Sequence, residues 1–232
     1  MLSIIIPTLN EQRYLPKLLR SIKNQKFHNY EIIVADGGSK DNTRKIAKTF
    51  GCKIVRGGTP AAGRNFGAKA ARGDILLFLD SDVELPPDFL TKFIRTFKRK
   101  KLGIASCNFR FFGEKKIDKV LSEFTNKLFD ILQYFQPQAA GWCIMVKSSI
   151  HKKIKGFDES LVLSEDLDYC IRASKHGKFG IIKSVSIGIS PRRLEKEGRL
   201  NYVAKCVYTQ GYRVIKRKIR RKIVRYELGN HK

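Results

Sequence analysis

The sequence predicts an α/β fold in which helices flank a mainly parallel sheet. Short apolar runs rich in β-branched residues alternate along the chain with segments whose apolar residues recur at helical spacing. Several runs are apolar throughout, which is typical of strands covered by helices on both faces. Acidic or amide side chains directly follow the runs, and the carboxyl ends of parallel strands meet at one edge of a sheet. A ligand site is therefore expected at that edge.

Strands are expected where apolar runs are bounded by glycine, proline or charge, and helices where the apolar period is near 3.6 residues. The expected strands are residues 2–6, 31–35, 53–55, 75–79, 104–109, 180–182 and 186–189. The expected helices follow the loop at 7–11, the turn at 36–39, the glycine-rich stretch 57–65, the Pro86–Pro87 pair, Lys115, Ser164 and Pro191. In the first unit Pro7 ends the strand, since proline cannot continue a central strand.

Three of the strand–loop junctions carry candidate ligand-binding side chains. Asn10 and Asp36 follow the first two strands, and Asp80 and Asp82 follow the strand at 75–79. Two carboxylates at this spacing suit a hard divalent cation bound to a diphosphate, although solvated acids at a strand end fit equally well. Arg64 enters the same crevice at a helix start, where it can contact a phosphate or base, or lie on the surface.

Composition restricts the class of protein. The chain has 232 residues and 42% hydrophobic content, enough for one large domain with an extension. Its 47 Lys and Arg against 21 Asp and Glu give a formal charge of +26, which implies an anionic partner: nucleic acid, an acidic membrane surface or phosphorylated substrates. Lysine enrichment is also common in heat-adapted proteins.

Five scattered cysteines without a C-x-x-C pair argue against a zinc site and against a disulfide framework. No apolar run approaches the roughly 20 residues of a membrane span, and the chain opens with a strand pattern instead of a signal peptide. A cytoplasmic protein is expected, one that meets a membrane only peripherally, at the inner face.

The second half of the chain carries three further features. Apolar residues from Lys115 to Phe135 form a helical stripe that we expect to be core or a lid rather than a lipid-binding face. Trp142, in a loop entering a strand, suits either stacking on an acceptor ring or core packing. Glu165 and Asp166 fall at a helix start, where the helix dipole alone would also favour acids.

Four motifs in this order resemble those of the family-2 glycosyltransferases, which have the GT-A fold, a Rossmann-like sheet flanked by helices. They are Pro7-Thr8-Leu9-Asn10-Glu11, Asp36-Gly37-Gly38-Ser39 with Asp41, Gly63-Arg64-Asn65 with Gly67, and Leu79-Asp80-Ser81-Asp82. Ser164-Glu165-Asp166 resembles the Glu-Asp motif of that family. Gly38 is a departure, because many members read Asp-Asp-Gly-Ser or Asp-Gly-Ser there.

The resemblance implies a nucleotide-sugar donor, UDP- or GDP-linked, and a divalent cation, Mg or Mn. It implies that the donor site is formed by Pro7, Thr8, Asn10, Glu11, Asp36, Gly37, Arg64, Asp80, Ser81 and Asp82. Asp82, more than Asp80, would bind the metal. Asp166, with Glu165, would activate a hydroxyl acceptor or position a lipid phosphate, and Gly141, Trp142, Arg192 and Arg193 would line the acceptor side.

Residues 1–190 are therefore interpreted as the catalytic domain, with a donor half at 1–100 and an acceptor half at 101–190. Residues 191–232 form a basic extension in which Tyr208, Tyr212, Ile215, Ile219, Ile223 and Tyr226 share a helical face. This helix either binds anionic lipid headgroups or packs its apolar face on the domain, and the two are compatible. The acceptor is expected to be lipid-linked or a saccharide.

Two other functions are alternatives to glycosyl transfer. The charge also fits a basic nucleic-acid-binding protein, but no nucleic-acid-binding module is recognisable and acids at the sheet edge would repel phosphate. A sugar nucleotidyltransferase on a related fold would carry a glycine-rich phosphate loop after the first strand, where this chain has Pro7-Thr8-Leu9-Asn10-Glu11.

Overall fold

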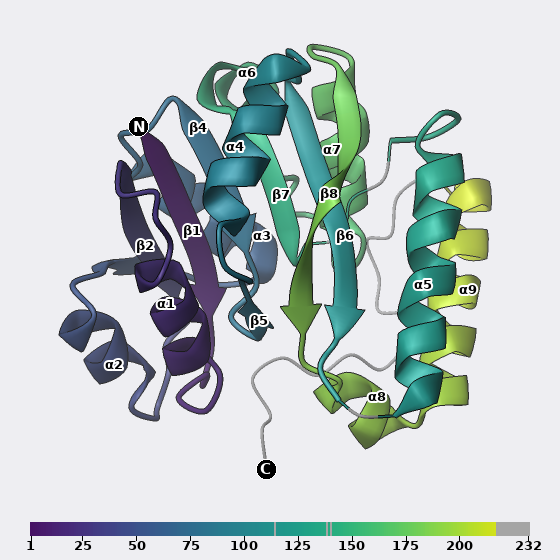
Figure 1. Cartoon of the computed structure of the whole chain (residues 1–232), viewed down its shortest axis with the longest axis horizontal. Coiled ribbons are helices and arrows are strands. Elements are labelled where there is room, and N and C mark those ends of the chain that lie inside the picture. Colours follow the sequence, from purple (N-terminus) through teal and green to yellow (C-terminus); the bar gives the residue numbers. More distant parts are fainter. Residues whose placement is uncertain (114, 138, 140, 217–232) are drawn as a thin grey trace.

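The computed structural model describes residues 1–113, 115–137, 139 and 141–216 (Figure 1). Its strands are β1 (Leu2–Thr8), β2 (Tyr30–Asp36), β3 (Lys53–Arg56), β4 (Ile75–Leu79), β5 (Val83–Glu84), β6 (Ile104–Phe111), β7 (Cys143–Lys147) and β8 (Phe179–Ile189). Its helices are α1 (Leu15–Lys23), α2 (Thr43–Thr49), α3 (Pro60–Lys69), α4 (Phe89–Arg99), α5 (Lys116–Leu132), α6 (Ser148–Lys153), α7 (Glu165–Ser174), α8 (Arg192–Glu197) and α9 (Arg199–Lys216).

The strands form one eight-stranded sheet in the order β3-β2-β1-β4-β7-β6-β8-β5. β1 to β4 are parallel to one another, as are β6 and β8, whereas β7 and β5 run antiparallel to their neighbours. The α/β fold with a mainly parallel sheet is therefore confirmed. Its register aligns Thr8 with Asp36, so the ends of β1 and β2 open on the same edge.

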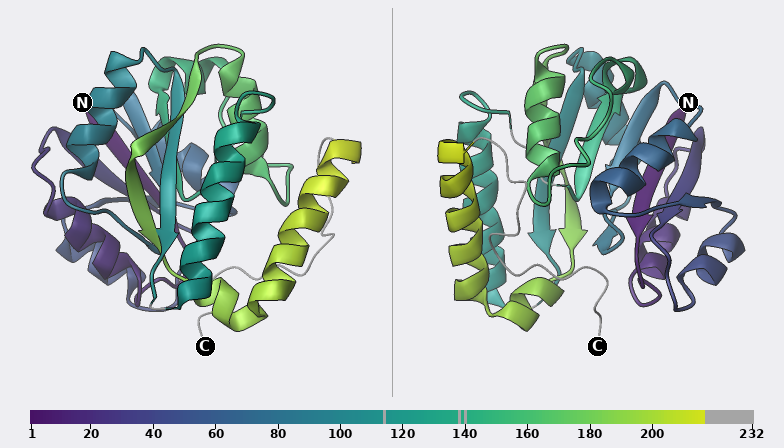
Figure 2. Two further views of the ribbon diagram at one scale, coloured as in Figure 1. Left: turned by 45° about the vertical axis from the view of Figure 1, so that its right-hand side comes forward. Right: turned by 180° about the vertical axis from the view of Figure 1, so that it is seen from behind.

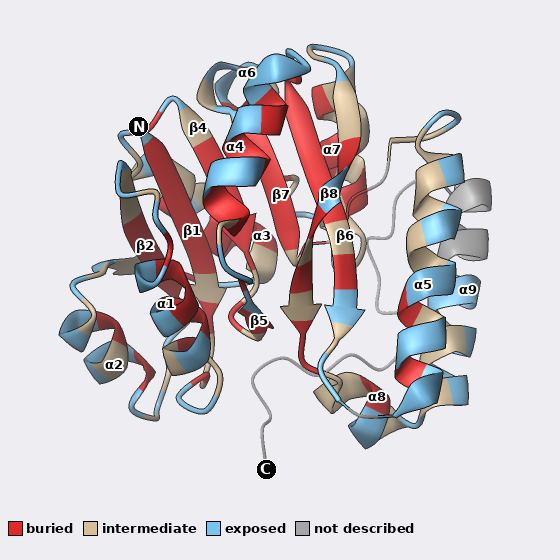
Figure 3. Cartoon of the chain, viewed as in Figure 1, coloured by how far each residue is buried: buried red, intermediate tan, exposed pale blue. Residues whose placement is uncertain are grey.

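Helices cover both faces of the sheet, which explains why its strands are apolar throughout (Figures 1 and 3). Alternate residues of β1 serve the two faces: Ile4 and Ile6 pack with α1 and α4, whereas Ile5 packs with the side that carries α3, α6 and α7. Viewed from behind, α3 and α7 lie across the second face (Figure 2).

The close approach of α3 to the sheet depends on its glycines. A Cβ added at Gly67 would lie 2.3 Å from Cγ2 of Ile5, and one added at Gly63 would lie 3.2 Å from the Cβ of Pro7. Glycine at these two positions lets the helix backbone rest on β1. The same packing fixes where the side chain of Arg64, next to Gly63, leaves the helix.

Three sequence-based expectations are wrong. Pro7 does not end the first strand, because β1 continues to Thr8 with Pro7 aligned with Ala35 of β2. The runs at 180–182 and 186–189 are parts of the single strand β8, whose pairing with β6 is irregular between Cys107 and Asn108. The apolar stripe of α5 is not core: Asp118 and Ser122 are the buried residues of this helix, and most apolar side chains of the stripe are exposed. Periodicity identified the helix but not which side faces the protein.

The C-terminal extension is helical as far as the structure describes it. Gly198, at a φ of 80°, separates α8 from α9. The expected helical face lies partly outside the described residues, because Ile219, Ile223 and Tyr226 belong to 217–232. No helix in the described part of the chain has the length and hydropathy needed to cross a bilayer.

Candidate active site

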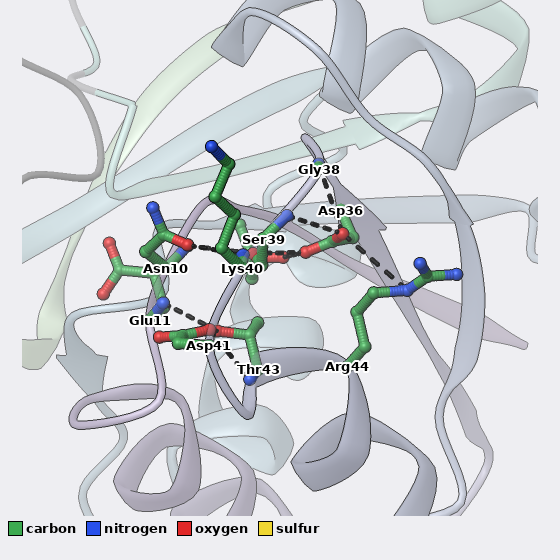
Figure 4. Close-up of polar contacts among 10 residues, drawn as sticks. Asn10, Glu11, Asp36, Gly38, Ser39, Lys40, Asp41, Thr43 and Arg44 are labelled. Carbon is green, nitrogen blue, oxygen red and sulfur yellow. Dashed lines mark hydrogen bonds and ion pairs between the residues drawn. The ribbon is translucent and has the colours of Figure 1, made fainter.

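The carboxylate of Asp36 is buried at the end of β2 and surrounded by donors (Figure 4). It accepts hydrogen bonds from the backbone N–H groups of Gly38 (3.2 Å) and Ser39 (3.1 Å) and from the hydroxyl of Ser39 (2.5 Å). The hydroxyl of Thr8, across the parallel register, donates a further bond of 3.4 Å. Gly38 has a φ of 94°, which permits this tight turn.

The loop after β1 is tied to the loop after β2 by reciprocal hydrogen bonds (Figure 4). Asn10, at a φ of 55°, donates its N–H to Ser39 Oγ (2.9 Å) and accepts the N–H of Lys40 at its Oδ1 (2.8 Å). Glu11 donates its N–H to Thr43 Oγ1 at 2.7 Å. These bonds fix the loop backbone and leave the Glu11 carboxylate to interact elsewhere.

Arg192, at the start of α8, joins Glu11 to Asp82. Its two terminal nitrogens donate to the Glu11 carboxylate at 2.9 and 3.0 Å, and its Nε lies 2.9 Å from Asp82 Oδ2. The guanidinium carbon lies 4.5 Å from the ring centroid of Tyr14, within the range of a cation–π contact. The expected acceptor residue Arg192 therefore interacts directly with the expected donor residues.

Burial is the main influence on Asp82. Desolvation raises the pKa of its carboxyl above the ordinary value, while the charges of Arg192 and Arg193 act in the opposite direction. Ser81 beside it is also buried. Asp82 is thus a carboxylate that requires a nearby cation to remain ionised.

A second guanidinium, Arg64, organises the other half of the site. It is almost fully buried and bonds to Glu165 through Nη1 (2.8 Å) and to Asp80 through Nη2 (2.9 Å). Its Nε is buried with no hydrogen-bond partner in the described part of the structure. The alternative that Arg64 is a surface residue is excluded.

Gly141 is required by this arrangement. A Cβ at this position would lie 2.4 Å from Arg64 Nη2. Its carbonyl oxygen accepts a long hydrogen bond from the same nitrogen (3.5 Å), and its N–H donates to Asp166 Oδ2 at 2.7 Å. Gly141 therefore lies between the arginine and the expected catalytic carboxylate.

Asp166 is half-buried in the first turn of α7, next to Glu165. Burial, and then the charge of Glu165, raise the pKa of Asp166 to about 7, against the opposing effect of Arg64 and of hydrogen bonds from Leu167 and Gly141. Ser164, just before the helix, has a φ of 61°, a conformation that costs free energy in a non-glycine residue. A carboxyl that titrates near neutrality suits proton transfer.

Other expected site residues have supporting positions. Pro7 lies under Gly63, and Gly37 donates its N–H to the Thr8 carbonyl at 2.8 Å. The Trp142 ring lies 4.6 Å from that of Phe109 and is nearly parallel to that of Phe129 at 6.4 Å, which favours a packing role for this half-buried side chain. Arg193 acts on Asp82 through its charge.

The expected residues fall into three groups. Arg64 joins Asp80, Glu165 and Gly141, and Gly141 in turn bonds to Asp166. Arg192 joins Glu11 to Asp82. Asp36, Thr8, Ser39 and Asn10 form the third group. In the described part of the chain no hydrogen bond or ion pair joins the Asp36 carboxylate to Asp82 or Asp166, and the loop 7–11 connects the second and third groups.

Sequence reasoning missed Tyr14, Ser39 and Thr43 as parts of the site. The ring of Tyr14, just before α1, meets the guanidinium of Arg192. Ser39 and Thr43 hold the loop through their hydroxyls. Their place in the turn after β2, three and seven residues beyond Asp36, is the signal that points to them.

Two carboxylates of the site could contribute to a cation site. No group of three or more His, Cys, Asp or Glu side chains within the described ranges is arranged to hold a metal ion. Mg²⁺ bound to a diphosphate, however, needs only one or two carboxylates from the protein. Asp80 and Asp82 supply two carboxylates at a sheet edge, so they fit a cation site shared with a diphosphate. In this structure Arg64 pairs with Asp80 and Arg192 with Asp82.

Known proteins resemble this chain in sequence. Residues 3–155 match the family described as Glycosyl transferase family 2. An uncharacterized glycosyltransferase of Haemophilus influenzae is 28% identical over 196 residues, which cover 77% of this chain and 64% of that protein. The undecaprenyl-phosphate 4-deoxy-4-formamido-L-arabinose transferase of Pseudomonas fluorescens is 36% identical over 107 residues, 40% of this chain and 30% of that protein.

The fold has close relatives among solved structures. The mannosyltransferase PcManGT from Pyrobaculum calidifontis, solved in complex with GDP-Man and Mn²⁺, superposes with a TM-score of 0.70 at 18% identity, over 89% of this chain and 64% of that one. This likeness confirms the GT-A fold. Since the family match covers most of the chain, the resemblance inferred from its motifs is confirmed: the chain belongs to glycosyl transferase family 2.

Proposed function

We propose that this chain transfers a sugar from a nucleoside-diphosphate donor to an acceptor, with inversion at the anomeric carbon. The observation that carries the proposal is the pair Asp80 and Asp82 at the carboxyl edge of the sheet, each bound to a different arginine. Carboxylates and guanidinium groups within one site are the groups that can share a metal-bound diphosphate. A nucleic-acid-binding groove would have no use for the acids.

The donor would lie along the edge from β2 to β4. The Asp36 cluster, with Thr8, Pro7 and Glu11, is proposed to bind the base and ribose, because its polar side chains are held in place at the ends of β1 and β2. Arg64 would face the phosphates from a buried position that costs little further ordering. PcManGT was solved with GDP-Man, and we propose a UDP- or GDP-linked sugar here.

Asp82, with help from Asp80, is proposed to bind Mg²⁺ or Mn²⁺ together with the donor phosphates. A bound divalent cation would stabilise the negative charge that develops on the departing diphosphate. The burial of Asp82, which disfavours its charged form, makes the carboxylate depend on such a cation or on Arg192. We therefore propose that the metal ion, when it binds, takes the place of the Arg192 guanidinium at the Asp82 carboxylate.

Asp166 is proposed to be the general base for a hydroxyl acceptor. The acceptor oxygen forms the new bond to the anomeric carbon as the bond to the diphosphate oxygen breaks, and Asp166 takes the hydroxyl proton. Its pKa of about 7 is close to the value that makes a base effective at neutral pH. With a lipid-phosphate acceptor, the kind of acceptor that the name of the Pseudomonas relative specifies, no proton need move and Asp166 would position the acceptor.

A thermal-shift titration tests the donor class. UDP, GDP and their sugar conjugates are added with and without Mg²⁺ or Mn²⁺, and a ligand present at about 100 times its Kd should stabilise the native state by about 2.7 kcal/mol. Asp82→Asn should abolish the metal-dependent part of the shift. Asp74→Asn, which changes an exposed acid at the amino end of β4, is the matched control. Equal shifts for Asp82→Asn and the control would refute the proposal.

A further inference from the structure

The orientation of α5 is opposite to that of an ordinary amphipathic helix. Its polar side faces the sheet: Asn126 bonds to both backbone groups of Phe109 (3.1 and 2.8 Å), and Gln133 accepts the N–H of Ile181 at 3.1 Å. Asp118 on the same side is held by Arg199 of α9. The helix is thus attached to the domain by hydrogen bonds and ion pairs, whereas most helices use their apolar face.

The apolar side of α5 points away from the domain. At 100° per residue its exposed apolar side chains lie within one narrow sector of the helix. The residues called the α5 stripe are Ile117, Val120, Phe124, Leu128 and Ile131 of α5, with Phe135 in the turn after it, and between 41% and 83% of each is exposed. The outward side of α5 is exposed along its length (Figure 3). A continuous apolar surface of this kind usually marks an interaction site.

The helix α9 does not cover the stripe. The two helices diverge, as the left view of Figure 2 shows, and α9 itself exposes Leu200 (87%) and Val207 (66%). Of the apolar face expected in the C-terminal helix, only Tyr208 has a described side chain, and it is 54% exposed.

Charge decides between the occupants of this surface. Three exposed lysines, Lys116, Lys119 and Lys127, accompany the α5 stripe on this helix, against one exposed acid, Glu123. A second copy would bring another formal +26 against this face, so charge disfavours self-association. A nucleic acid would bind the cations but leave the apolar side chains in water. An apolar stripe accompanied by exposed lysines matches the interface of a bilayer that contains anionic lipids.

We propose that the α5 stripe is the face on which this protein docks on an anionic lipid bilayer. The inner side of the same helix reaches the acceptor loop, since Phe129 stacks on Trp142, which follows Gly141. If the proposed function holds, docking would bring lipid-linked acceptors to the loop that contacts Asp166. The docking surface itself does not depend on which reaction is catalysed.

Co-sedimentation of the full chain with vesicles tests the proposal. Vesicles of phosphatidylcholine with an equal share of phosphatidylglycerol should bind the protein, whereas vesicles of phosphatidylcholine alone should bind it at least about tenfold more weakly, because the exposed lysines would lack a partner. The double substitution Phe124→Gln with Ile131→Gln should weaken binding to the anionic vesicles at least about tenfold through lost apolar burial. Both side chains are exposed, so the melting temperature should not fall.

Phe66→Gln is the matched control. Phe66 is 40% exposed, but α3 packs on β1 and β2, and β4 and β7 lie between these strands and β6, to which α5 is attached. Its vesicle binding should equal that of the unsubstituted chain. Equal binding by the stripe variant would overturn the proposal. The proposal would also be overturned if the unsubstituted chain did not bind vesicles but formed a dimer in sedimentation equilibrium, and if the stripe substitutions dissociated that dimer. The donor-induced thermal shift of the stripe variant is measured separately. A normal shift with lost vesicle binding concerns docking alone, whereas the absence of a shift in the unsubstituted chain would count against the proposed function.

Discussion

Arg192 holds the carboxylate of Glu11 by two hydrogen bonds, of 2.9 and 3.0 Å, although 181 positions separate the residues in sequence. The same guanidinium reaches Asp82, so the start of α8 lies against the loops that follow β1 and β4. Two largely buried acids share this one cation. Removing the Arg192 side chain would take this guanidinium away from both carboxylates.

We therefore expect Arg192→Ala to destabilise the protein by about 3–5 kcal/mol, the usual cost of removing one partner from a buried ion pair. Urea denaturation at neutral pH measures the loss. The control is Arg72→Ala, which removes an arginine whose side chain is 75% exposed and which pairs with Glu31. That change should cost no more than about 1 kcal/mol. Similar losses of unfolding free energy in the two variants would mean that the buried Arg192 pairs stabilise the protein no more than an exposed pair does.

The pKa of Asp166 predicts the pH dependence of the reaction with a hydroxyl acceptor. The base must be deprotonated, and burial beside Glu165 raises its pKa to about 7. The kcat/KM should therefore rise with pH and level off above about 7. Asp166→Asn should lower the rate by about 100-fold or more and remove this limb, while the donor-induced thermal shift remains. Near-full activity of Asp166→Asn on a hydroxyl acceptor would exclude the general-base role.

The same group makes stability depend on pH. The folded pKa of about 7 exceeds the value of about 3.9 for an unfolded aspartate, so the folded state binds more protons between those values. The free energy of unfolding should therefore fall as pH rises from about 4 to 7, by up to about 1.4 kcal/mol per pH unit, and then level off. Asp166→Asn should show a shallower fall, measured by urea denaturation across this range. A slope unchanged by the substitution would assign the titration to another group, Asp82 being the next candidate.

Local patterns predicted one part of the site and could not predict the rest. Asp36, Asp80 and Arg64 follow strands or open a helix, and parallel topology alone brings such positions to one edge. The contact of Arg192 with Glu11 depends on how the extension returns to β1, which no local pattern contains. The prediction that the apolar side of α5 is buried failed for a different reason. A helical period shows that one side is apolar, but the polar side of α5 has backbone groups of β6 to bond, through Asn126.

Gly141 provides a test of how closely the two halves of the site fit. A Cβ at this position would lie 2.4 Å from Arg64 Nη2, and the guanidinium cannot yield without straining its pairs with Asp80 and Glu165. Gly141→Ala should therefore cost about 1–3 kcal/mol of stability, as overpacking usually does, and weaken the donor-induced thermal shift. Arg64→Lys removes the branched end that meets the new methyl group. The stability cost of Arg64→Lys should therefore be smaller in the Gly141→Ala variant than in the unsubstituted chain. A double-mutant cycle measures this coupling. Additive costs would show that the loop moves away from Arg64 and that the glycine is not needed for this contact.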